Sequence, residues 1–215
     1  MKKLLLLFTL LIFGLASCSK DDDPDPSITD EGVVINGVRW ATRNVDAPGT
    51  FAQTPADPGM LFQWNCRIGW SATDPLVSSP VGREWGRFTG GTTGETILAW
   101  ARSNDPCPPG WRVPTHVELE SLLSAIGEWT TQPAVGRVFR CGNNILFLPA
   151  TATRNWFGNR ELDFVGLPLL RGFFWSSERR GGVGTDVWSL GIESKGVFMA
   201  IRSPFFGHSV RCVAE

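Results

Sequence analysis

One stretch of the chain has the hydrophobic spacing of an amphipathic helix. Thr115 followed by Glu118 has the pattern of an N-terminal capping box. The apolar residues after it stand at positions i, i+3, i+4 and i+7: Leu119, Leu122, Leu123 and Ile126. This spacing predicts about three turns of helix with one buried face, ended by Gly127. Cys107, two prolines and Trp111 precede it, so we expect a cysteine-anchored helix laid on a sheet.

The other hydrophobic runs are short and typical of strands. Residues 33–41 place an Asn-Gly pair between two β-prone runs, which predicts a hairpin. Further strands are expected over seven segments: 60–66, 137–141, 145–149, 174–177, 186–192, 196–201 and 209–213. The run 145–149 is apolar throughout and is therefore expected to be a central strand. A second, short helix is expected over 95–102, and a connector over 129–132.

These elements predict an α+β fold of short, mainly antiparallel strands with one or two flanking helices and long irregular loops. The longest loops are expected at 69–94 and 151–173, and loops of this length in compact domains are often functional. The chain has 215 residues, of which 42% are hydrophobic, enough for one domain with a sizeable core. Its net charge of −1 argues against a nucleic-acid binder that neutralises phosphates.

The first residues form a targeting segment. Two lysines, an apolar run over 4–15 and the ending Leu-Ala-Ser-Cys predict a signal peptide of residues 1–17. The apolar run is too short for a comfortable membrane span. Its ending resembles a bacterial lipobox, so Cys18 is expected to become the first residue and to carry acyl chains such as palmitate as the only membrane anchor. An ordinary secretory peptide with an incidental cysteine is the alternative.

Residues 18–31 follow as a charged, proline-containing tether that is too polar to bury. It holds six acidic residues: Asp21, Asp22, Asp23, Asp25, Asp30 and Glu31. An acidic run directly after a lipobox resembles the signal that exports lipoproteins of the Bacteroidetes to the outer face of the outer membrane. A solvated spacer is the plainer interpretation. The folded domain is expected over 32–215.

Six short motifs, taken in order, carry a family resemblance. They lie at 37–45, 62–65, 107–115, 146–150, 174–177 and 209–213. Together they resemble the Fibrobacter succinogenes major paralogous domain over about residues 32 to 215. That resemblance implies a fold related to C-type lectins and to formylglycine-generating enzymes, in a secreted or lipid-anchored protein. It implies more about fold than about activity.

The resemblance also bears on the cysteines, for which an exported chain permits disulfides. With Cys18 lipidated, four cysteines remain and allow three connectivities. Cys107 and Cys212 lie in motifs shared with the family, which implies that they pair. Cys66 and Cys141 fall outside the family pattern, and we predict that they form a second bridge. The cysteine spacings contain no C-x-x-C pair, so no metal site is expected.

No catalytic constellation stands out in the sequence. There is no G-x-S-x-G elbow and no pair of carboxylates suited to acid–base chemistry. His116 in the first helical turn and His208 before the last strand are interpreted as surface or structural residues. We therefore predict that the protein is not an enzyme and has no cofactor. An enzyme of the formylglycine-generating lineage, which uses cysteines, is a minor alternative.

The loops carry the candidate ligand-binding residues. The motifs by which C-type lectins hold calcium and sugar are absent: 131–134 and 64–66 lack the acids and are misplaced. What remains is aromatic and arginine-rich: Trp70, Trp85, Trp156, Phe157, Arg154, Arg160, Arg179 and Arg180. Aromatic and arginine side chains are frequent in binding sites, although tryptophans also fill irregular cores. The latter role is favoured for five of them: Trp40, Trp64, Trp111, Trp175 and Trp188.

The sequence therefore predicts a lipid-anchored binding module on the outer membrane, facing the cell exterior. It is expected to be a monomer that contacts a glycan or a protein through the loops at 69–94 and 151–186, without calcium and without nucleic acid. The alternative to a binding module is a structural or assembly lipoprotein of the envelope.

Overall fold

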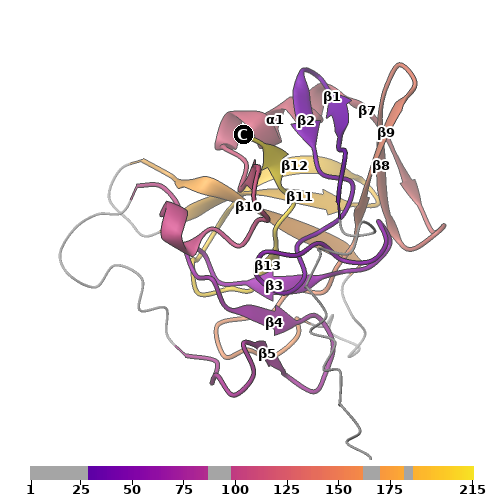
Figure 1. The fold of residues 1–215 in the computed structure, drawn as a ribbon. Helices are drawn as coiled ribbons and strands as arrows, with labels where there is room; N and C mark the ends of the chain where they lie inside the picture. Colours follow the sequence, from indigo (N-terminus) through magenta and orange to yellow (C-terminus); the bar gives the residue numbers. More distant parts are fainter. Residues whose placement is uncertain (1–28, 87–97, 162–169, 182–185) are drawn as a thin grey trace, which may run out of the picture.

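The computed structural model describes residues 29–86, 98–161, 170–181 and 186–215. Over these residues the protein is mainly antiparallel β structure, with three sheets and one short α-helix (Figure 1). The predicted short antiparallel strands are therefore present, but the protein is mostly β because its helical content is small.

The first sheet joins the two ends of the described chain. Its four strands, in spatial order, are β1 (Val33–Ile35), β2 (Val38–Trp40), β14 (Val213–Ala214) and β6 (Trp111–Arg112). The predicted hairpin β1–β2 is confirmed. Its turn residues Asn36 and Gly37 have φ values of 49° and 83°, which a two-residue type I′ turn requires and which Asn and Gly tolerate best.

The second sheet is the largest and crosses the middle of the molecule (Figure 1). Its spatial order is β12 (Gly196–Arg202), β11 (Val187–Glu193), β10 (Arg171–Arg179), β13 (His208–Ser209), β3 (Met60–Phe62), β4 (Gly69–Ser71) and β5 (Ser78–Ser79). All its pairings are antiparallel except β10 with β13. The predicted loop 69–94 thus begins with two short strands at the sheet edge.

The third sheet has three strands: β7 (Ile126–Thr130), β8 (Gly136–Cys141) and β9 (Asn144–Pro149). The prediction that 145–149 is a central strand is wrong, because β9 lies at the edge of this sheet. The strand is apolar because Leu146 and Leu148 pack into the buried cluster that also contains Phe174 and Leu190. The connector predicted over 129–132 instead begins inside β7.

The helix is shorter than its hydrophobic spacing predicts. Helix α1 (His116–Glu120) passes into a 3₁₀ turn, η3 (Ser121–Ser124), and β7 then begins at Ile126. The capping box is confirmed: Glu118 N donates to Thr115 Oγ1 at 3.3 Å, and Thr115 N donates to Glu118 Oε2 at 2.8 Å. The expected third turn is absent because Ile126, 78% exposed, pairs with Arg140 of β8 instead.

The second predicted helix, over 95–102, is not formed in its described part. Residues 95–97 lie outside the described residues. Ala99 forms an isolated bridge with Glu178, so the chain is extended there. A 3₁₀ turn, η2 (Arg102–Asn104), follows instead.

Two buried clusters form the core. One gathers Trp64, Trp175 and the Cys107–Cys212 disulfide, and the other gathers Trp40, Leu119 and Phe174. The predicted core role of Trp40, Trp64 and Trp175 is confirmed, since each has no exposed surface. Trp111 and Trp188 are half-buried.

The cysteine predictions have different outcomes. The Cys107–Cys212 disulfide is present and ties the segment before α1 to the segment before β14. The predicted Cys66–Cys141 bridge is wrong, because the structure leaves both thiols unpaired. Cys66 lies half-buried in the β3–β4 connection, whereas Cys141 is exposed at the end of β8 beside the β8–β9 turn.

Candidate functional site

Five of the predicted binding residues meet where the two long loops pack together. Trp70 of β4 stacks edge-on against Trp85, with ring centroids 5.1 Å apart. Trp85 Nε1 donates to the backbone oxygen of Trp156 at 3.1 Å. The Trp156 ring lies 4.6 Å from that of Phe205. Arg154 and Arg160 belong to the same loop and form a backbone bridge with each other.

Arg154 is buried and not a surface contact, which corrects its predicted exposure: only 1% of the residue is exposed. Its guanidinium donates to Ser71 O at 2.8 Å, Thr73 O at 2.6 Å and Gly158 O at 2.7 Å, and it also contacts the Asp74 carboxylate at 3.2 Å. Burial lowers its pKa, and the Asp74 carboxylate opposes that shift. Arg154 therefore holds the loop after β4 to the loop before β10.

The remaining arginines have different surroundings. Arg160 Nη1 lies 3.9 Å from Asp74 Oδ2, so it belongs to the same cluster. Arg179, at the end of β10, lies over the Trp64 ring at 5.0 Å. Arg180 follows it and donates its backbone N–H to Asp186 O. No contact among the described residues joins Arg179 or Arg180 to Arg154, so the predicted residues do not form one site.

The exposed part of the cluster is a tight turn with two aromatic side chains. Trp156 is 43% exposed and Phe157 is 79% exposed. Asn155 closes the turn, because its side-chain oxygen accepts from Phe157 N at 2.9 Å and from Asn159 N at 3.2 Å. Gly158 has φ +82°, and a Cβ there would lie 2.7 Å from Trp85. The turn is thus fixed from both sides. The Phe157 side chain is largely exposed, whereas the Trp156 ring packs on Phe205 and is exposed only in part.

His208 is a structural residue in the core, as predicted. It is fully buried and lies between Trp175 and Phe173, at ring distances of 4.3 Å and 5.2 Å. Burial lowers the pKa of His208 well below its usual value, and the charges of Arg202 and Arg171 lower it further. The imidazole is therefore neutral in the folded protein near neutral pH.

We expect His208 to make folding sensitive to mild acid. Since the folded-state pKa is depressed, the contribution of neutral His208 to the free energy of unfolding is fully present above the unfolded-state pKa of about 6.5. As the pH falls below that value, the free energy of unfolding decreases by up to about 1.4 kcal/mol per pH unit. Urea unfolding between pH 7.5 and 5.5, above the main titration of carboxylates, measures this slope. His208→Leu should flatten it, whereas His116→Gln, which removes a ring stacked on Trp188, should not. An unchanged slope in His208→Leu would contradict the assignment.

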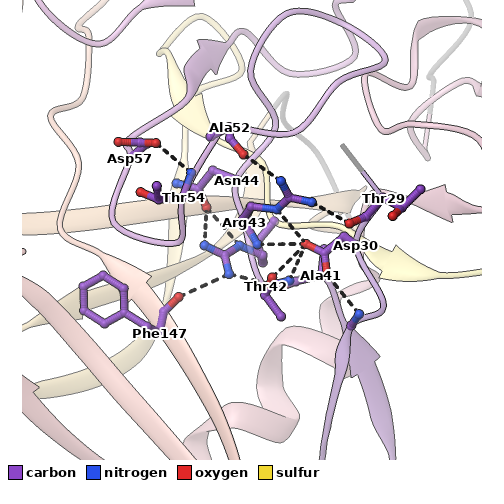
Figure 2. Close-up of polar contacts among 12 residues, drawn as sticks. Thr29, Asp30, Ala41, Thr42, Arg43, Asn44, Ala52, Thr54, Asp57 and Phe147 are labelled. Carbon is purple, nitrogen blue, oxygen red and sulfur yellow. Dashed lines mark hydrogen bonds and ion pairs between the residues drawn. The ribbon is translucent and has the colours of Figure 1, made fainter. Parts of the chain in front are cut away.

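Asp30 is the centre of a buried polar network that the sequence did not predict. The sequence placed this residue in the solvated tether. The Asp30 side chain is 1% exposed. Its Oδ2 accepts from Thr42 N at 2.8 Å, from Thr42 Oγ1 at 2.9 Å and from Arg43 N at 3.2 Å, and its Oδ1 accepts from Gly32 N (Figure 2). The ordered part of the chain therefore begins before residue 32.

Two arginines complete this network. Arg43, next to Asp30 in Figure 2, donates to Thr29 O at 2.8 Å and to Ala52 O at 3.3 Å. Arg211 has no exposed surface; it donates twice to Asn44 Oδ1, at 2.7 Å and 2.9 Å, and also to two backbone oxygens. Burial lowers the pKa of Arg211 to about 9, a shift that Asp30 opposes, so the guanidinium is charged at neutral pH.

Nothing in the sequence distinguished Asp30 from the other five acids of the run, because its role depends on contacts with residues more than ten positions away. Arg43 and Arg211 lie inside the first and last family-like motifs, yet a motif alone does not reveal that both are buried. The polar side chains of this network bond to one another and to the backbone, an arrangement that holds the N-terminal segment to the strand β2 region.

Some classes of site have no counterpart in the described part of the chain. No group of three or more His, Cys, Asp or Glu residues there is placed to hold a metal ion. Within the same residues, no helix is long and apolar enough to cross a membrane. In comparisons with known proteins, no family model, no curated protein and no solved structure matches this chain.

Proposed function

We propose that the protein is a lipid-anchored binding module of C-type-lectin-like fold at the outer face of the outer membrane. It recognises a glycan or a protein through its loops, without calcium. Acylation of Cys18 and export are supported by the lipobox-like ending and the acidic run after it. The fold assignment is supported by the pairing of the terminal strand β14 with β2, and by the Cys107–Cys212 disulfide.

The observation that carries the binding proposal is the aromatic turn at Trp156 and Phe157. Large aromatic side chains are usually buried, so a largely exposed Phe157 next to a partly exposed Trp156 on a fixed turn supports a binding role. Their ring faces suit the C–H surface of a sugar or an apolar anchor of a protein. Because Arg154 and Gly158 hold the turn, little conformational entropy is lost when a ligand binds.

The test is a glycan-array measurement on the full-length chain in mild detergent, with calcium and with a chelator. We expect binding that the chelator leaves intact and that Phe157→Ala weakens about tenfold or more, as for an interface hot spot. Trp156→Ala should act similarly. The matched control is Ile126→Ala on β7, which removes an equally exposed apolar side chain, 78% against 79%.

The outcomes separate the alternatives. Binding that survives both aromatic substitutions, or that requires calcium, would overturn the proposal for this turn. A folded chain that binds no glycan on the array, but whose wild type retains envelope proteins that Phe157→Ala does not retain, would identify the ligand as a protein. Arg154→Ala is unsuitable as a binding test, because this buried side chain holds the loops together.

A further inference from the structure

A second candidate binding site is an open pocket of about 620 Å³ beside the β3–β4 connection. It is lined by Asn65, Cys66 and Arg67 of that connection, by Pro48, and by Ser79 and Arg83 near β5. The volume is in the range of small-molecule sites. Its lining shares no residue with the aromatic turn, and among the described residues that line it none is acidic.

The charge at this pocket comes from two arginines. Arg67 and Arg83 are exposed, and neither guanidinium forms an ion pair with a described residue. Arg67 also lines a smaller neighbouring pocket that contains Asp105. The Asp105 carboxylate already accepts from Cys107 N at 2.9 Å and from Val113 N at 3.1 Å. Burial raises the pKa of Asp105 and the charge of Arg67 opposes that shift, so Arg67 and Asp105 interact at longer range. Neither guanidinium forms an ion pair with a described residue, so both can contact a ligand.

Asn65 lines the pocket, and its side-chain amide is held in one orientation. The residue is 1% exposed and has a positive φ of 57°. Its Oδ1 accepts from Ala101 N at 2.8 Å and from Asn104 Nδ2 at 3.3 Å, which fixes the orientation of the amide. Its Nδ2 has no partner among the described residues. A buried donor without a partner is uncommon and calls for an explanation.

We propose that this pocket binds a small ligand that carries an oxyanion, of about the size of one acidic sugar. Arg67 and Arg83 contact the anionic group, because guanidinium groups pair with carboxylate and phosphate in fixed geometry. A carboxylate and a phosphate share this chemistry, so the test includes both. The pocket and the aromatic turn are separate sites, and either can bind a ligand without the other.

The two unpaired thiols give a direct readout. Cys66 lines the pocket, whereas Cys141 is exposed on another sheet and serves as the internal reference. The full-length chain in mild detergent is treated with iodoacetamide, and peptide mass spectrometry follows the two residues separately. Burial raises the pKa of the Cys66 thiol, so the reaction is run at mildly alkaline pH. The probes are glucuronate, inorganic phosphate and glucose.

We expect glucuronate to slow alkylation of Cys66 several-fold and to leave Cys141 unaffected. Protection by glucuronate alone would assign an acidic sugar, and protection by phosphate as well would assign the oxyanion itself; both support the site. Protection by glucose to the same degree, or no protection by either anion, would overturn the proposal.

Substitutions separate this site from the aromatic turn. Arg83→Gln and Arg67→Gln should each raise the glucuronate concentration needed for half-protection about tenfold or more, the loss expected for a hydrogen bond to a charged group. Lys195→Gln removes the same charge from an exposed turn and is the matched control. Anion protection that survives both arginine substitutions would also overturn the proposal.

Phe157→Ala should leave this protection unchanged, because Phe157 does not line this pocket. Failure of the proposal for the pocket is therefore distinguishable from failure of the proposal for the aromatic turn.

Discussion

Replacement of Asp30 by alanine is expected to lower the free energy of unfolding by about 3–5 kcal/mol, the range for breaking a buried ion pair from one side. The Asp30 side chain is 1% exposed, and its Oδ2 lies 3.5 Å from Arg43 Nε. Its removal would leave several donors without an acceptor and would leave Arg43 and Arg211 as two buried cations. A network satisfied only in part is worse than an apolar core.

Urea unfolding of the full-length chain measures this loss. Glu31→Ala is the control, because it removes an exposed acid one residue away and should change stability by less than about 0.5 kcal/mol. A chain that starts at residue 32 should behave like Asp30→Ala, since it also lacks this carboxylate. If the two alanine variants were equally stable, the buried role of Asp30 would be refuted.

Removal of the Cys107–Cys212 disulfide by the double substitution to alanine is expected to cost about 2–5 kcal/mol. The two cysteines are separated by 105 residues, so the bond closes a long loop and restricts the unfolded chain strongly. Both cysteines are also in the core, at 7% and 0% exposure, so their loss opens space that the surrounding residues fill only in part.

The same measurement on the double variant Cys66→Ser and Cys141→Ser is the control. These thiols are unpaired in the structure, so their joint removal should leave the denaturation midpoint of the oxidised protein nearly unchanged. A reducing agent should lower the midpoint of the wild type and leave the Cys107–Cys212 double variant unaffected. A large loss in the serine variant would instead favour a Cys66–Cys141 bridge.

Features decided by neighbouring residues were predictable from the sequence. The type I′ turn at Asn36-Gly37 and the Thr115–Glu118 capping box depend on φ preferences and on groups three residues apart, and both are present. The helix length was not predictable in this way. Leu123 and Ile126 continue the apolar spacing, yet pairing with β8 draws Ile126 into a strand. Tertiary contacts override such spacing.

Features decided by distant contacts were not predictable. An arginine in a polar loop is expected at the surface, and Arg154 is buried only because Ser71 at the end of β4 and Thr73 after it pack against its guanidinium. Asp30 is likewise one acid among six until the β2 region surrounds it. For the candidate site, the sequence identified both loops and Trp156, but it did not separate Phe157, which faces solvent, from Arg154, which does not.

The burial of Asp30 also has a mechanical meaning for an anchored protein. With Cys18 held in the membrane, as proposed, the eleven residues 19–29 separate it from Asp30, and a fully extended chain of that length reaches about 40 Å. The folded domain would therefore stay within about 40 Å of the bilayer. A force on a bound ligand would reach Asp30 before it reaches β1, so we expect the Asp30–Arg43 contact to bear this force before the β1–β2 hairpin does.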